Sequence, residues 1–157
     1  MSKYNDAVKL MEERFGQEKD VVISLATIAL SPSENGRPRP AVRNIDAYYE
    51  DGAFYAVTYA KSGKMRQIEQ NPEVALDVCH EWFTASGAGE NLGWVLDPKN
   101  ADMRAKLRKV FSEWYDFANN EQDPHCVILK IRLVSGLLLK DHGAVRYEID
   151  FVNQTAV

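Results

Sequence analysis

The segment from residue 58 to residue 64, Thr-Tyr-Ala-Lys-Ser-Gly-Lys, gathers residue types that bind phosphate. It stands directly before a short stretch with the spacing of a helix. Free backbone N–H groups and the helix dipole attract anions to the start of a helix. Lys64 would lie in the first turn and add a full positive charge, and Thr58 could add a hydroxyl hydrogen bond. These residues therefore predict a phosphate-binding loop.

Arg43 lies in the neighbouring strand of the predicted hairpin and could hold a phosphate through two parallel N–H bonds. The G-x-x-x-x-G-K-[ST] spacing of a nucleoside-triphosphate loop is absent from the segment. A second interpretation stays open, because runs of charged residues around a turn usually face water. Residue types and spacing alone do not choose between these two interpretations.

The overall charge argues against a surface that binds nucleic acid. The chain has 19 Lys and Arg residues against 23 Asp and Glu residues, a net charge of −4. An oligonucleotide-binding barrel would need aromatic residues interleaved with several cations, and the tyrosines at positions 48, 49, 55 and 59 lack them. Residues 37–66 nevertheless hold six Lys or Arg residues (37, 39, 43, 61, 64 and 66) against three acidic ones (46, 50 and 51). The positive charge is therefore concentrated where a phosphate is expected.

Turn signals and apolar runs alternate in the first part of the chain. Asn35-Gly36 and Asp51-Gly52 are typical of tight hairpin turns. A short amphipathic helix precedes them, and Gly16 is placed to end it. We expect this helix over residues 5–15 and strands over residues 21–30, 41–49 and 53–58.

The second part begins with a short helix that Ser62 can cap and that Asn71-Pro72 ends. Asp97-Pro98 opens a further helix, whose apolar stripe comprises Met103, Leu107, Val110, Phe111, Trp114 and Phe117. The remaining strands are expected over residues 74–79, 82–94, 126–133, 137–139 and 145–151. Many antiparallel strands with two or three helices predict a mainly antiparallel β-barrel of the α+β class. The length of 157 residues suits one domain, residues 1–157.

Cysteine usage and hydropathy indicate a cytoplasmic protein that does not enter a membrane. Cys79 and Cys126 are too few for a disulfide framework. The N-terminus has no apolar run behind its charges, so no signal peptide is expected. The longest apolar stretch, residues 21–30, falls far short of the roughly 20 residues that cross a bilayer.

Metal and nucleophile chemistry find little support. Cys79-His80 and His125-Cys126 each pair a thiol with an imidazole, but neighbours on a strand point to opposite faces. No spacing typical of zinc ligands is present, so we expect no metal site. No paired carboxylates indicate acid–base catalysis, and the catalytic residues stay unassigned.

Residues 20–80 resemble the pyridoxamine 5′-phosphate oxidase-like FMN-binding split-barrel family, in its general stress protein branch. The family pattern orders an Arg-containing strand, an Asp-Gly hairpin, a strand ending in Thr, a Ser-x-Lys and an Asn-Pro. The matching residues are Ser24 to Thr27, Arg43, Asp51-Gly52, Thr58, Ser62-Gly63-Lys64, Arg66-Gln67-Ile68 and Asn71-Pro72. The resemblance implies a split β-barrel of six to eight strands with two or three flanking helices.

The resemblance also implies FMN as the cofactor and a homodimer with FMN in the groove between the subunits. Carried over by position, Arg43, Ser62 and Lys64 would hold the phosphate. Thr58 would lie near the phosphate and the ribityl chain, and backbone groups around Asn44, Ile45 and Val57 would line the flavin. Three tryptophans are candidates to cover the ring, although core packing is the alternative for Trp114: Trp82, Trp94 and Trp114.

Two departures from the family pattern bear on the substrate. The C-terminal segment of true pyridoxamine 5′-phosphate oxidases has spaced arginines around a tryptophan, whereas this C-terminus has only Arg146. The family's Ser-Arg-Lys is Ser62-Gly63-Lys64 here. Both departures argue against vitamin B6 phosphate as the substrate. The resemblance then implies an oxidoreductase that passes hydride or electrons between FMN and a small organic molecule, with a non-catalytic carrier or stress sensor as the alternative.

Overall fold

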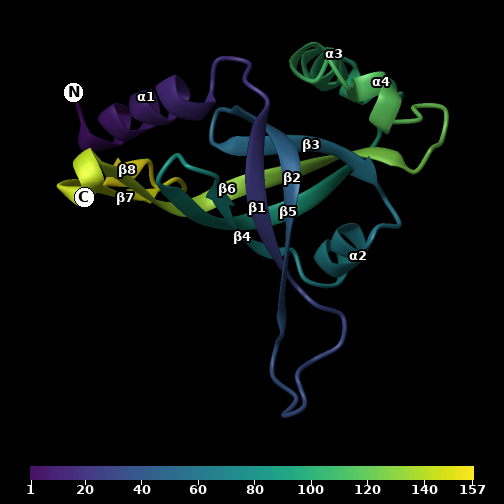
Figure 1. Cartoon of the computed structure of the whole chain (residues 1–157), viewed down its shortest axis with the longest axis horizontal. Helices are drawn as coiled ribbons and strands as arrows, with labels where there is room; N and C mark the ends of the chain where they lie inside the picture. Colours follow the sequence, from purple (N-terminus) through teal and green to yellow (C-terminus); the bar gives the residue numbers. More distant parts are fainter.

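Tight glycine turns and long apolar strands build a closed antiparallel barrel (Figure 1). The computed structural model describes residues 1–157. At the Asp51-Gly52 turn both residues have positive φ, 47° and 77°, as a two-residue hairpin turn requires. The barrel strands follow the order β3-β2-β1-β4-β5-β6, and β3 pairs with β6 to close it. Their bounds are β1 Val21–Ile28, β2 Pro40–Glu50, β3 Ala53–Tyr59, β4 Glu73–Val78, β5 Phe83–Trp94 and β6 Cys126–Lys140.

The sheet continues beyond the barrel along the second half of β6. Residues 135–140 of β6 pair with β7 (Val145–Asp150), which pairs with the short β8 (Thr155–Ala156). The two strands expected over residues 126–133 and 137–139 are therefore one long strand. The structure confirms the expected fold class, a mainly antiparallel α+β barrel, with six strands in the barrel and two more beyond it.

The first helix, α1 (Lys3–Phe15), buries its apolar face against the barrel core. Ser2 caps it, because the Ser2 hydroxyl accepts a hydrogen bond from the backbone N–H of Asn5. Phe15 is fully buried, and its ring lies 5.2–5.8 Å from the rings of Tyr49, Phe54 and Phe83. These contacts fix α1 on the barrel.

The barrel is split between β2 and β3. These two strands pair only over Tyr48–Glu50 and Ala53–Tyr55, next to their hairpin turn. Beyond that point β2 continues along β1 and β3 continues along β6. Helix α2 (Gly63–Gln70) follows β3 directly (Figure 1). It packs close to β5, since a Cβ atom on Gly89 would lie 2.9 Å from Ile68.

The last helical region differs from the expected single helix. Asp97 caps a short 3-10 turn, Pro98–Asn100, which leads into α3 (Ala101–Val110), and α4 (Tyr115–Ala118) is separate. The predicted apolar stripe is therefore wrong at its end. Phe117 is 97% exposed, because the break after α3 rotates it out of phase with Leu107 and Phe111. The break also raises the number of α-helices to four.

None of these helices combines the length and the apolar character that crossing a membrane demands. The two cysteine–histidine pairs also stay apart in the sheet. Strand β5 separates β4, which ends before Cys79, from β6, which begins at Cys126.

The contrast between Phe15 and Phe117 gives a test of this packing. We predict that Phe15→Ala lowers the free energy of unfolding by about 3–5 kcal/mol, because it leaves a cavity among three aromatic rings. Phe117→Ala should change it by less than about 0.5 kcal/mol, because the side chain already faces solvent. Urea unfolding followed by circular dichroism measures both. A similar loss in the two variants would contradict the division of the helix.

Candidate functional site

Arg43 projects from β2 into a hydrogen-bonded network at the split end of the barrel. Its Nη1 donates to the backbone oxygen of Leu25 at 3.2 Å and to the hydroxyl of Thr27 at 2.6 Å. Its Nη2 donates to Oε1 of Gln67, on α2, at 2.8 Å. The guanidinium of this β2 residue is thus hydrogen-bonded to β1 and to α2.

The N-terminus of α2 presents polar groups that the protein itself does not use. Ser62 takes the predicted N-cap position, but its hydroxyl makes no bond to the helix. Ser62 Oγ is the one buried side-chain nitrogen or oxygen of the molecule without a hydrogen-bond partner. Such an atom costs free energy unless a partner binds it. The unpartnered hydroxyl and the free N–H groups of the helix N-terminus can together bind an anionic oxygen of a ligand.

Lys64, in the first turn of α2, brings a second cation close to Arg43. Burial and, after it, the nearby Arg43 guanidinium lower the pKa of Lys64. Burial also lowers the pKa of Arg43. Neither side chain takes part in an ion pair with a carboxylate. Two half-buried cations without a counter-ion repel one another, and a bound anion would relieve that repulsion.

A cavity of about 280 Å³ opens where β2 and β3 separate, and Lys64 lines it. Both strands contribute to the wall. The lining includes four of the residues predicted from the sequence, together with two that were not: Ile45, Val57, Thr58 and Lys64, with Asp46 and Asn119. The split of the barrel therefore brings together residues that are up to 74 positions apart in the chain.

Three predicted site residues do not line this cavity, one of them Ser62 at the N-terminus of α2. Asn44 points to the outer face of β2, where its Oδ1 accepts a hydrogen bond from the Ser24 hydroxyl at 3.0 Å. Arg43 does not line the cavity either and instead lies beside Lys64 in the network with Thr27.

The three tryptophans occupy three different environments. Trp114 lines the cavity and donates its Nε1–H to Asp20 at 2.8 Å. Trp94 donates to the backbone oxygen of Glu121, and Trp82 is 63% exposed beside Arg14 on another part of the surface. Of the three, only Trp114 can contact a ligand in the split.

A pair of carboxylates at the rim of the cavity escaped the sequence analysis. Asp20, before β1, lies beside Asp46 of β2. Burial and, to a smaller extent, the Asp46 carboxylate raise the pKa of Asp20, while the hydrogen bond from Trp114 opposes this shift. No sequence motif links Asp20 and Asp46, because only the pairing of β1 with β2 brings them together.

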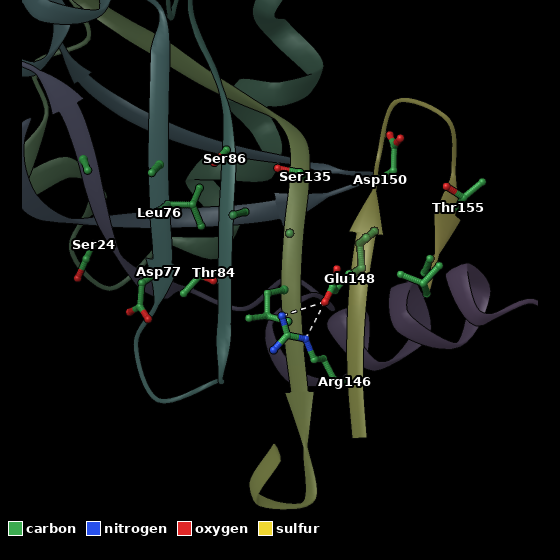
Figure 2. A pocket seen from close by; sticks show the side chains of 18 of the residues that line it. Ser24, Leu76, Asp77, Thr84, Ser86, Ser135, Arg146, Glu148, Asp150 and Thr155 are labelled. Carbon is green, nitrogen blue, oxygen red and sulfur yellow. Dashed lines mark hydrogen bonds and ion pairs between the residues drawn. The ribbon is translucent and has the colours of Figure 1, made fainter. Parts of the chain in front are cut away.

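A groove on the sheet is a second, separate feature. A groove of about 820 Å³ crosses the outer face of β1, β4, β5, β6, β7 and β8 (Figure 2). Small side chains dominate its floor, among them Ser24, Thr84, Ser86 and Ser135. An ion pair between Arg146 and Glu148 stands at one side, with 2.9 Å between nitrogen and oxygen. None of the residues predicted to bind the cofactor lines this groove.

The fold is shared with solved flavin- and heme-binding proteins. An FMN-binding protein related to pyridoxamine 5′-phosphate oxidase, from Nostoc punctiforme, has a TM-score of 0.61 and 18% identity, covering 100% of this chain and 95% of that one. A FAD-binding protein from Mesorhizobium loti has a TM-score of 0.60 and 19% identity over 87% of this chain and 92% of that one. A heme-binding protein from Mycobacterium smegmatis has a TM-score of 0.60 and 13% identity over 92% of this chain and 59% of that one.

These likenesses show the fold, and the ligands named for the three proteins differ. The sequence matches no protein-family model and no curated protein. The structure thus has the split-barrel fold of the pyridoxamine 5′-phosphate oxidase-like proteins and of general stress protein 26, as the resemblance in sequence predicted. The ligand has to be inferred from the residues of this chain.

The unpaired charge of Lys64 should weaken the free protein. Because its pKa is lower in the folded than in the unfolded chain, the folded state binds fewer protons between the two values, and stability rises with pH there. We predict that Lys64→Met stabilises the ligand-free protein at pH 7 by less than about 1 kcal/mol, because solvent screens the repulsion on a side chain that is only half-buried. The difference in stability between the variant and the wild type should shrink as the pH approaches 10, because Lys64 of the wild type then loses its proton and its charge.

Urea unfolding of the wild type and the variant at several pH values measures this difference. Lys61→Met is the matched control, because Lys61 is an exposed lysine of the same loop. Equal effects of the two substitutions, or a loss of stability in Lys64→Met at pH 7, would contradict an uncompensated charge at position 64.

Proposed function

We propose that this protein is an FMN-binding flavoprotein of the pyridoxamine 5′-phosphate oxidase-like family. One observation carries the proposal. Arg43 and Lys64 are two half-buried cations that lie close together without a carboxylate partner, and Ser62, two positions before Lys64, has a buried hydroxyl without a hydrogen-bond partner. A phosphate monoester carries nearly two negative charges and strong acceptor oxygens at neutral pH, so it matches this set of donors. FMN ends in such a group.

Different residues of the chain would bind different parts of the cofactor. Lys64, the free N–H groups of Arg43 and the N-terminus of α2 would hold the phosphate, and Ser62 would donate its unused hydroxyl. The cavity in the split, with Ile45, Val57 and Thr58 in its wall, would take the adjoining part of the molecule. Trp114 at the rim is placed to exclude water from it.

We further propose that the protein is a cytoplasmic oxidoreductase for a small organic substrate. Bound FMN supplies hydride or electron transfer, and the protein contributes position and electrostatics. Both cysteines are free thiols, which suits a reducing compartment. The alternative is a non-catalytic flavin carrier or stress sensor. Anaerobic addition of NAD(P)H separates the two, because bleaching at turnover rates favours the enzyme and flavin that stays oxidised favours the carrier or sensor.

The proposal also includes a homodimer with the site at the subunit interface. The cavity in the split, about 280 Å³, is smaller than the roughly 300–1,000 Å³ of typical ligand pockets. The groove and the cavity adjoin through the outer face of β2, because Asn44 bonds Ser24 of the groove and Asp46 lines the cavity. A second copy seated in the groove would lie beside the split and could complete the cofactor site.

Lys64→Ala tests the cofactor. We predict that purified wild-type protein shows a flavin absorbance spectrum, or binds added FMN, and that Lys64→Ala weakens FMN binding by about 1.5–3 kcal/mol, the value of a charged hydrogen bond. Lys61→Ala should bind FMN like the wild type. Fluorescence titration of the apoproteins gives both dissociation constants. A colourless wild-type protein that fails to bind added FMN would refute the proposal, and an unchanged affinity in Lys64→Ala would move the phosphate elsewhere.

Ser86→Arg tests the dimer, because Ser86 is exposed on the floor of the groove (Figure 2). We predict that sedimentation equilibrium gives about twice 17.8 kDa for the wild type and about 17.8 kDa for Ser86→Arg, whose FMN affinity should fall as well. Ser112→Arg, an exposed serine between α3 and α4, is the matched control and should remain dimeric. A monomeric wild type with full FMN affinity would overturn the shared site.

A further inference from the structure

Thr27 is a buried polar residue beneath the proposed phosphate site. Its exposed fraction is 1%, and apart from Asn100 the buried residues are apolar. The Thr27 hydroxyl accepts a hydrogen bond from Arg43 Nη1 at 2.6 Å and donates to Gln67 Oε1 at 2.5 Å. Gln67 Oε1 also accepts from Arg43 Nη2 at 2.8 Å. Thr27, Gln67 and Arg43 thus form a closed triangle of hydrogen bonds from three different elements.

The triangle determines which donors of Arg43 remain free. A guanidinium has five N–H groups. Both hydrogens of Nη1 are used, one by Leu25 and one by Thr27, and one hydrogen of Nη2 is used by Gln67. The Nε–H and the second Nη2–H remain available. Parallel N–H groups of this kind suit two oxygens of one phosphate.

The triangle also holds Arg43 near Lys64 against their mutual repulsion. Gln67 follows Lys64 by three positions on α2, so both side chains lie on the same face of the helix. Without hydrogen bonds to Thr27 and Gln67, the flexible Arg43 side chain would turn toward solvent, where its charge is better hydrated and farther from Lys64. A site that is already arranged binds its ligand more tightly, because less freedom is lost on binding.

We infer that Thr27 and Gln67 are positioning residues that fix Arg43 for the phosphate of the ligand. This inference rests on the proposed FMN site. Both residues lie within the motifs that match the family pattern, but neither was assigned a role in binding the cofactor. Both act only through Arg43, so their contribution to FMN binding disappears when Arg43 is removed.

A double-mutant cycle between Thr27 and Arg43 tests this role. FMN dissociation constants are measured by fluorescence titration for the wild type, Thr27→Val, Arg43→Ala and the double variant. We expect Thr27→Val to raise the dissociation constant by about tenfold in the wild-type background and by less than about twofold in the Arg43→Ala background. Gln67→Met should behave like Thr27→Val. Thr27→Ser retains the hydroxyl and should bind FMN within about twofold of the wild type.

Arg66→Ala is the matched control, because it removes an exposed arginine from the same helix and should leave the FMN dissociation constant unchanged. Equal fold losses for Thr27→Val in both backgrounds would overturn the inference, since they would mean a general structural effect. Unchanged FMN binding in Thr27→Val would overturn it as well. A wild-type protein that binds no FMN would instead refute the proposed function itself, and the inference with it.

Discussion

The repulsion between Arg43 and Lys64 is the physical constraint on which the proposed site depends. Two cations lie half-buried at the open end of the barrel, and no carboxylate neutralises them. Lys64 is placed there because α2 follows β3 directly. Arg43 is held near it by hydrogen bonds to Thr27 and Gln67. The separation of β2 from β3 provides the adjoining cavity. A bound phosphate would relieve the repulsion between the two cations.

Much of the fold could be predicted from local sequence signals. The Asp51-Gly52 turn and the stop at Asn71-Pro72 depend on backbone preferences that neighbouring residues do not override, and both stand where expected. The division between α3 and α4 could not be predicted. Phe117 continues the helical spacing of Leu107 and Phe111, yet the break in the helix rotates it into solvent. Periodicity indicates which residues could share a face but not where a helix ends.

The candidate site was predictable only in its charged part. Arg43 and Lys64 could be proposed from their chemistry, and the structure brings them together. The hydrogen bonds of Thr27 could not be foreseen, because they join β1, β2 and α2 and require the register of the barrel. The cavity was equally hidden, since it arises where two strands cease to pair. Ser62 shows the same limit. It stands at the N-cap of α2 as predicted, but its hydroxyl makes no capping hydrogen bond.

A parallel titration of the apoprotein with FMN and with riboflavin tests the phosphate site most directly, because the two flavins differ only in the phosphate. If Arg43, Lys64 and Ser62 bind that group, FMN should bind at least about tenfold more tightly than riboflavin. Added salt should narrow the difference, because it screens the charge interaction. Equal affinities for FMN and riboflavin would contradict a phosphate site at Arg43 and Lys64.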